Sequence, residues 1–228
     1  MKHLIIGDLH GKDCWKAINV DDYEKIIFIG EYVDHWTLPD HVIIKNLLDV
    51  IELKKTHPEK VELLLGNHDV QYLHYPNFLC SGLRPQMQTK LTHVFDSNRH
   101  LFNIAYQRGQ HLFSHAGVTN KWYLEFIELP IVEQVRDEDD TIADIFNKIE
   151  KTSKRGLLHR AGSSRGGYGS GGVTWADKKE LIADALEGYF QVVGHTVLQE
   201  IEVHQFTGKS AVFIDVLDYE TKFYEIDC

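Results

Sequence analysis

Polar residues able to bind divalent metal ions follow several short apolar runs of the sequence. The apolar residues 4–6 precede Asp8 and His10, and residues 26–29 precede Glu31. Further polar residues of this kind are Asn67, His68, His115 and His195. All of them offer oxygen or imidazole nitrogen, the ligands that suit ions of the Mn, Fe or Zn type. Two such ions roughly 3.5–4 Å apart can generate a hydroxide and hold the oxygens of an in-line displacement at phosphorus. The residue types therefore indicate metal-dependent chemistry on a phosphate ester.

The spacing of apolar residues predicts how these side chains come together. Residues 4–6, 26–29 and 63–65 are short apolar runs followed by glycine, which is typical of buried strands that end in a turn. Residues 40–56 place apolar side chains at helical spacing, and Pro58 follows as a stop signal. Strand, helix and strand in this order build a parallel sheet, whose ligands lie beyond the carboxyl ends of the strands. We therefore expect the polar groups to meet at one edge.

The rest of the chain predicts a second sheet and further helices. Residues 101–106 and 111–114 flank a turn and are typical of a hairpin. Amphipathic helices are expected over residues 140–154 and around residues 181–186. The expected strands of a C-terminal meander are residues 191–193, 200–206, 211–214 and 222–226. A glycine-rich segment, residues 162–172, is expected to form a loop. The prediction is an α/β fold with two sheets.

Composition limits the class of protein. The 228 residues are 43% hydrophobic and 25% charged, ordinary values for a globular chain, and we expect one domain over residues 1–228. The formal net charge of -10 argues against non-specific binding to duplex nucleic acid, because that affinity comes from cationic side chains that replace counterions. The cysteines, Cys14, Cys80 and Cys228, form no CxxC pair and suit reduced thiols. No apolar stretch approaches the length of a secretory or membrane-spanning segment, so we expect a cytoplasmic protein with no membrane partner.

Five short motifs occur in a fixed order at the predicted strand ends. They are residues 7–11 (Gly-Asp-Leu-His-Gly), 30–34 (Gly-Glu-Tyr-Val-Asp), 66–69 (Gly-Asn-His-Asp), 114–117 (Ser-His-Ala-Gly) and 194–196 (Gly-His-Thr). Over residues 7–196 this order resembles the calcineurin-like metallophosphoesterases. The first motif, and the absence of a second histidine two residues after His195, resemble the phosphoprotein-phosphatase branch, which includes bacterial and phage phosphatases and dinucleoside polyphosphate hydrolases. The resemblance implies a two-sheet β-sandwich flanked by helices.

The resemblance also implies roles for the residues of the motifs. The implied ligands are Asp8 and His10 for one metal ion, Asn67, His115 and His195 for the other, and Glu31 as the bridge between them. Manganese is the first candidate for both ions, with iron or zinc as alternatives. His68 stands where the family keeps the histidine that protonates the leaving oxygen, and Asp34 where its orienting carboxylate stands. The physical roles agree, because a carboxylate partner fixes the tautomer of an imidazole and favours its charged form.

Two positions depart from the family pattern. Glu31 replaces the usual aspartate and is longer by one methylene, about 1.5 Å, so the bridge is expected to shift or to use a single oxygen. His35 and Trp36 stand where the family continues with Arg-Gly, so a guanidinium that would hold substrate phosphate is missing. Arg165 in the glycine-rich segment is the expected substitute, because arginine offers phosphate a bidentate fork. His35 is a second candidate for a donor to phosphate. An ordinary surface position is the alternative for both side chains.

The expected function is hydrolysis of phosphate monoesters, in phosphoproteins or small nucleotides. A phosphodiesterase or dinucleotide hydrolase could use the same metal chemistry, and the sequence does not separate these substrates. A third alternative is a degenerate member that binds metal or phosphate as an interaction module, which Glu31 and the missing arginine favour. The retained pair of His68 and Asp34 argues against this alternative, because a binding module does not need a general acid.

Overall fold

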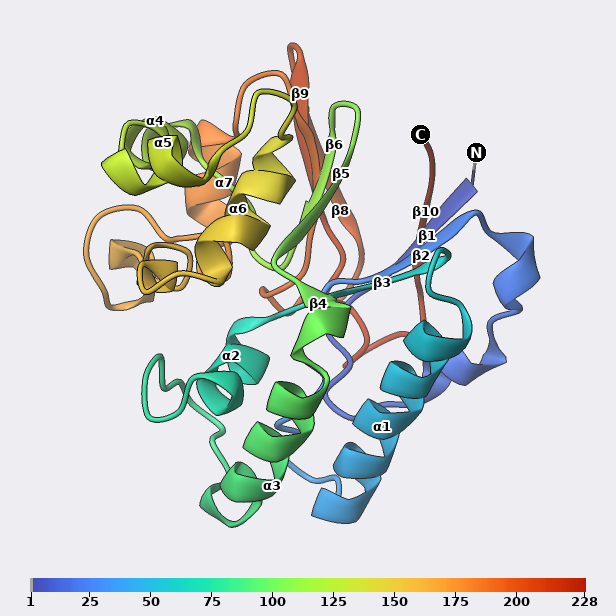
Figure 1. Cartoon of the computed structure of the whole chain (residues 1–228). Helices are drawn as coiled ribbons and strands as arrows, with labels where there is room; N and C mark the ends of the chain where they lie inside the picture. The colour runs from blue at the N-terminus through green and yellow to red at the C-terminus, as the bar shows by residue number, and fades with distance from the viewer. Residues whose placement is uncertain (1) are drawn as a thin grey trace.

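The computed structural model describes residues 2–228 and contains two sheets (Figure 1). The first sheet carries three of the sequence motifs, which follow the carboxyl ends of its parallel strands. In spatial order its strands are β10 (Tyr224–Asp227), β1 (Lys2–Ile6), β2 (Lys25–Phe28), β3 (Val61–Leu64) and β4 (Phe102–Asn103). Strands β1 to β4 run parallel, and β10 is antiparallel to β1. The motifs that contain Asp8, Glu31 and Asn67 therefore follow three adjacent parallel strands, as predicted.

The second sheet contributes three further strand ends. In spatial order its strands are β5 (Ala105–Arg108), β6 (His111–Ser114), β7 (Phe190–Val193), β9 (Lys209–Phe213) and β8 (Glu202–Phe206). Strands β6, β7 and β9 run parallel, whereas the edge strands β5 and β8 are antiparallel to their neighbours. His115, His195 and Asp215 follow the carboxyl ends of the three parallel strands.

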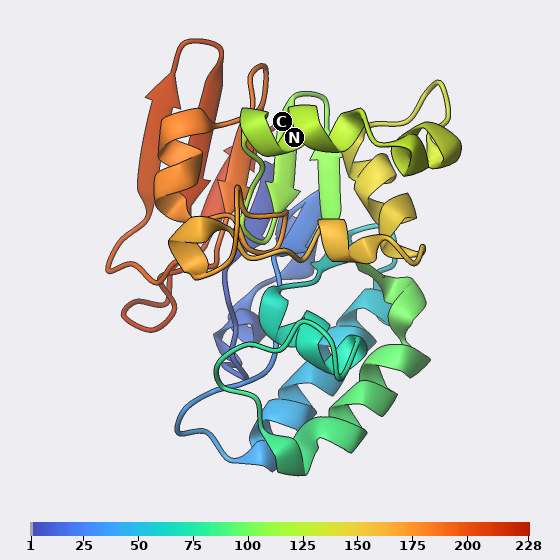
Figure 2. The same cartoon turned by 90° about the vertical axis from the view of Figure 1, so that its left-hand side faces the viewer.

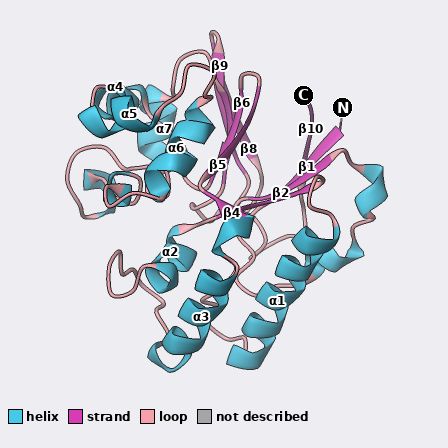
Figure 3. Ribbon diagram, viewed as in Figure 1, coloured by secondary structure: helices cyan, strands magenta, loops and turns pink. Residues whose placement is uncertain are grey.

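Helices cover the outer sides of the two sheets (Figures 1 and 2). They are α1 (Asp40–Thr56), α2 (Asn67–Leu73), α3 (Pro85–Ser97), α4 (Asn120–Ile127), α5 (Pro130–Val135), α6 (Ile142–Glu150) and α7 (Lys178–Asp184). Figure 3 shows α1 to α3 on the side of the first sheet and α4 to α7 on the side of the second. None of the described helices is long and apolar enough to cross a membrane.

Alternating side chains of β1 connect the layers. Ile5 packs in an apolar cluster with Phe113 and Val192 of the second sheet. Leu4 and Ile6 point to the opposite face and join the cluster that includes the buried side of α1. Because successive strand residues point to opposite faces, one strand fills two layers. Two stacked sheets with helices outside confirm the predicted two-sheet α/β fold.

Two predictions about strands are wrong. The predicted hairpin is present, because β5 and β6 pair antiparallel across the turn at residues 109–110, but its first strand does not extend over residues 101–106. Those residues are divided between β4 of the first sheet and β5 of the second, and the chain crosses at Ile104, whose N–H donates to Asn147 at 2.7 Å. The C-terminal strands form no single meander, because β7 and β9 are parallel and β10 pairs with β1. Alternation identifies a strand but not its neighbour, which depends on long-range packing. The helix over residues 40–56 is confirmed as α1, and the other two expected helices occur as α6 and α7.

Candidate active site

A cavity of about 220 Å³ lies beyond the carboxyl ends of both sheets. The lining residues are His10, Glu31, Asp34, His35, Trp36, Asn67, His68, Ser81, Arg165, Trp175, His195, Val197, Asp215 and Asp218. The two remaining predicted site residues, Asp8 and His115, are fully buried and contact His195 and Glu31, respectively. The structure therefore brings all of the predicted site residues together.

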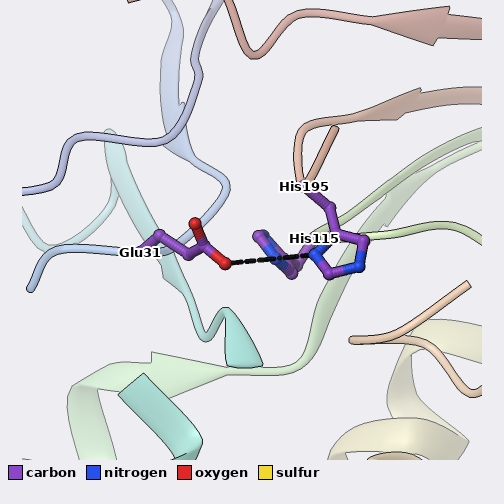
Figure 4. A group of neighbouring side chains, drawn as sticks. All are labelled: Glu31, His115 and His195. Carbon is purple, nitrogen blue, oxygen red and sulfur yellow. Dashed lines mark hydrogen bonds and ion pairs between the residues drawn. The ribbon is translucent and has the colours of Figure 1, made fainter. Parts of the chain in front are cut away.

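Glu31 lies between two groups of imidazoles. Its Oε2 is 2.8 Å from Nε2 of His10, and its Oε1 is 3.0 Å from Nε2 of His115. Two groups of possible ligand atoms within 4.8 Å of one another share this carboxylate: Asp8, His10 and Glu31, and Glu31, His115 and His195. Figure 4 shows the carboxylate pointing toward the rings of the second group. Each oxygen of the carboxylate therefore faces a different group.

Lone pairs converge on one point near Nε2 of His115. Oδ1 of Asn67 lies 2.9 Å and Nδ1 of His195 lies 3.1 Å from this nitrogen. Nδ1 of His115 lies 3.1 Å from the backbone carbonyl of Ile29, and Nδ1 of His10 lies 2.8 Å from another backbone carbonyl. Donation to these carbonyls places the proton of each neutral ring away from the site and leaves Nε2 free to bind a cation, as in most metal-bound histidines.

The buried carboxylate of Asp8 has a hydrogen-bond partner at only one of its oxygens among residues 2–228. Oδ2 accepts from the N–H of His195 at 2.9 Å, whereas Oδ1 has no donor. Gly194 leaves the space for Oδ1, because a Cβ at that position would lie 2.0 Å from it. Burial, and then the charge of Asp215, raise the pKa of Asp8 well above its usual range. A buried carboxylate in this state is destabilising unless a cation compensates it.

Four residues of the site have a left-handed backbone. The φ angles are 46° at His10, 56° at Glu31, 65° at Asp34 and 67° at His195. Residues other than glycine adopt this region at a cost, and such strain is concentrated at functional sites. The backbone thus supports the assignment of this cavity independently of the side chains.

Asp69 holds the backbone around Glu31, a role that the motif alone does not reveal. Its buried carboxylate accepts from the N–H groups of Glu31 at 2.7 Å, Tyr32 at 2.9 Å and Gly66 at 2.9 Å. Its position in the first turn of α2, where backbone amides lack partners, is the signal that could have identified it. Asp215 is also outside the five motifs, although it follows an apolar strand as the other site residues do.

His68 and Asp34 form the predicted pair at the side of the cavity. Nδ1 of His68 lies 3.1 Å from Oδ2 of Asp34. The same carboxylate accepts from Gln71 and Tyr72, each at 2.5 Å, so its position is fixed. Burial lowers the pKa of His68, but the charge of Glu31 and the bond to Asp34 outweigh this effect and raise it to about 11. The ring is therefore protonated at neutral pH, and a cation at Glu31 would bring its pKa down by cancelling that charge.

Arg165 and His35 reach the cavity from two loops. Nη2 of Arg165 donates to the hydroxyl of Thr196 at 2.8 Å, and Nε pairs with Asp177 at 2.8 Å. Nδ1 of His35 accepts from the N–H of Leu38 at 3.0 Å, which places the ring proton on Nε2. Burial lowers the pKa of His35, so a neutral ring can donate from Nε2. The loop containing Arg165 thus provides a cation beside the last motif.

A second group of buried histidines surrounds Glu150, outside this cavity. The carboxylate lies 2.6 Å from Nε2 of His74 and 2.8 Å from Nε2 of His159. The spacing would suit a metal ion, but Nδ1 of His74 faces Arg155 at 3.0 Å and must accept from it. The proton of His74 is then on Nε2, directed at Glu150. Nδ1 of His159 lies 3.0 Å from the hydroxyl of Thr174, so the group is a complete hydrogen-bond network.

Comparisons with known proteins agree with this geometry. The family model of the calcineurin-like phosphoesterases matches residues 1–199. None of the curated proteins matches the sequence significantly. The structure is similar to a cold-active protein-tyrosine phosphatase of a psychrophilic Shewanella species, with a TM-score of 0.59 and 17% identity over 94% of this chain and 71% of the other. A protein serine/threonine phosphatase from Saccharomyces cerevisiae gives a TM-score of 0.52 and 16% identity over 93% and 67% of the chains. At such low sequence identities, these structural similarities show a shared fold alone.

Proposed function

The chain belongs to the calcineurin-like phosphoesterases, hydrolases that act on phosphoric esters, and from this premise we propose that it hydrolyses phosphate monoesters with two divalent cations. The proposal rests on the position of Glu31, because its two oxygens face two separate groups of possible ligand atoms. One carboxylate shared by two such groups is what a pair of adjacent cations requires.

The donor atoms fit cations of the Mn, Fe or Zn type, with manganese as the first candidate. In this proposal Asp8 and His10 hold one cation, Asn67, His115 and His195 hold the other, and Glu31 holds both. Burial lowers the pKa of His195 to about 4, so the ring is neutral at neutral pH, as a ligand must be. When bound, the cations would lower the pKa of the attacking water and stabilise the charge on the transferring phosphoryl group.

His68 would supply the proton for the leaving oxygen. Asp34 holds Nδ1 at 3.1 Å, so the ring can release its proton only from Nε2, on the cavity side. The bond to Asp34 preserves the tautomer after the transfer, and Nε2 is then protonated again from water. The non-bridging oxygens of the substrate would contact Arg165 and His35, whose side chains line the same cavity. Phosphoproteins and small nucleotides are both substrates that this arrangement could serve.

Metal-stripped protein tests the proposal when it is assayed with added manganese, iron or zinc. The substrates are para-nitrophenyl phosphate, its bis ester, a phosphopeptide and a dinucleoside polyphosphate. We expect hydrolysis of the monoesters only with added cation, and loss of most activity in His115→Ala. His93→Ala, which removes an exposed histidine of α3, is the matched control and should retain native activity. Native activity of His115→Ala would refute the two-cation site, and faster hydrolysis of the bis ester would identify a phosphodiesterase.

A further inference from the structure

Six parallel strands end at the cavity, and five of them are followed by a residue of the proposed metal site. The sixth is β9, which is followed by Asp215. We infer that Asp215 supplies a further carboxylate to the cation on the side of Asp8 and His10. The inference rests on the proposed function and adds a ligand that none of the five sequence motifs contains.

The register of the second sheet places Asp215 beside His195. Strands β7 and β9 pair in parallel, and the last registered pair is Val193 with Phe213. His195 and Asp215 each stand two residues beyond that pair. The N–H of Leu198 donates to the backbone carbonyl of Asp215 at 2.8 Å and fixes this turn. The carboxylate therefore begins from the same strand-end position as a proposed ligand.

The backbone at Asp215 also packs against the first motif. A Cβ on Gly7 would lie 2.6 Å from the carbonyl oxygen of Ile214 and 3.5 Å from Cα of Asp215. Only glycine allows so close an approach at this position. Asp215 is consequently adjacent to the segment that carries Asp8, and its side chain lines the cavity.

The side chain of Asp215 is buried without a hydrogen-bond donor. It is 3% exposed, and no group of residues 2–228 donates to its carboxylate or forms an ion pair with it. Oδ1 of Asp8 is likewise buried and without a donor. The charge of Asp215 acts on Asp8, and a cation would stabilise buried carboxylates that repel each other.

Asp218 provides the matched comparison at the same cavity. Its carboxylate is 42% exposed and forms an ion pair with Lys12 at 2.6 Å. Asp218 thus already has a cationic partner, whereas Asp215 has none among the described residues. The effects of replacing Asp215 and Asp218, two acidic residues on one loop, can therefore be distinguished by experiment.

The test is manganese binding to metal-stripped native protein, Asp215→Asn and Asp218→Asn by isothermal titration calorimetry. We expect two ions in the native protein and in Asp218→Asn. In Asp215→Asn one ion should bind about tenfold or more weakly, while the other keeps its native affinity. Melting temperatures give a second readout, which does not depend on hydrolysis. Without metal, Asp215→Asn should melt higher than the native protein because a repelling charge is gone, and manganese should raise its melting temperature less.

Native affinity for both ions in Asp215→Asn would overturn the inference and leave the proposed function intact. An equal loss in Asp218→Asn would also overturn it, because the effect would then be one of general charge. A native protein that binds no manganese, iron or zinc would refute the proposed function itself and the inference with it.

Discussion

Nδ1 of His68 lies 3.1 Å from Oδ2 of Asp34, which directs the other ring nitrogen to the cavity. If His68 is the general acid, its removal should matter most for leaving groups that need a proton. We expect His68→Ala to lower kcat/KM for alkyl phosphates by about 10²- to 10⁴-fold. The loss on para-nitrophenyl phosphate should be less than about tenfold, because para-nitrophenolate leaves without protonation. Steady-state kinetics on the two substrates measure the difference.

Asp34→Asn should show the same preference for the good leaving group, because it removes the charge that favours the protonated ring of His68. Equal losses on both substrates for His68→Ala would mean that the residue holds a cation or phosphate instead.

Glu31 is predicted to be the required residue at its position, despite the aspartate that is usual in the family. Aspartate is shorter by about 1.5 Å and could not reach both His10 and His115, which lie 2.8 and 3.0 Å from the two oxygens. Gly66 leaves space for the longer chain, because a Cβ there would lie 2.5 Å from Cγ of Glu31. We therefore expect Glu31→Asp to weaken manganese binding by about tenfold or more, and Glu31→Ala to abolish hydrolysis. Tighter binding in Glu31→Asp would contradict this reading.

The strand ends were the part of the site that the sequence could predict. Asp8, Glu31 and Asn67 follow apolar runs that form adjacent parallel strands, and parallel strands bring their carboxyl ends to one edge. Local patterns were sufficient here, because each run is short, apolar and closed by glycine. Asp215 directly follows the apolar residues 211–214, which no glycine closes, so a rule based on apolar runs alone would have included it.

Other parts of the site depend on contacts that local patterns do not contain. Asp69 acts on Glu31 through backbone amides 37 and 38 positions away in the chain. The place of β10 beside β1 depends on packing between the two ends of the chain, and alternation of side chains cannot indicate it. The left-handed φ of His195 is also invisible in a sequence, because residues other than glycine rarely adopt it.

Arg165 is predicted to bind the phosphate of the substrate. Its guanidinium is held by Thr196 and Asp177 at the edge of the cavity, so its removal should weaken binding without moving the metal site. We expect Arg165→Ala to raise KM for phosphate monoesters by about tenfold with a smaller change in kcat. Arg160→Ala is the control, because this exposed arginine just before the glycine-rich segment does not line the cavity. A native KM in Arg165→Ala would refute the assignment.

Acid should destabilise the protein through the network around Glu150. Burial raises the pKa of Glu150, but the bonds from His159 and His74 outweigh it and lower the pKa to about 2. Burial also lowers the pKa of His74. The folded state then binds fewer protons than the unfolded state, so the free energy of unfolding decreases as the pH decreases. The fall begins below about pH 6.5 through His74 and continues between about 4.5 and 2 through Glu150.

Glu150→Gln tests this network by urea unfolding at pH 7, 5 and 3.5. At pH 7 we expect the free energy of unfolding to be lower by about 1.5–3 kcal/mol, the usual worth of hydrogen bonds to a charged group. The slope below pH 4.5 should be smaller than in the native protein, because the titrating group is gone. Glu133→Gln, which changes an exposed partner of Arg136, should have the native stability and slope. A native profile in Glu150→Gln would show that the network does not contribute.

The backbone of His195 is predicted to be strained in the conformation that lets its imidazole reach the cavity. Its φ is 67°, where a Cβ is unfavourable, and its N–H is fixed by Oδ2 of Asp8 at 2.9 Å. In metal-stripped protein, His195→Gly should therefore be more stable than His195→Ala by about 1 kcal/mol. Glu125, which is exposed in α4, is the control position. There the Glu125→Gly variant should be less stable than Glu125→Ala by about 1 kcal/mol, because glycine is unfavourable in a helix. Urea unfolding of the four variants measures both differences. If alanine were as stable as glycine at position 195, the left-handed backbone would carry no strain. If the glycine variant is the more stable one at position 195 and the alanine variant is the more stable one at position 125, the fold accepts an unfavourable backbone conformation where a ring nitrogen must reach the cavity.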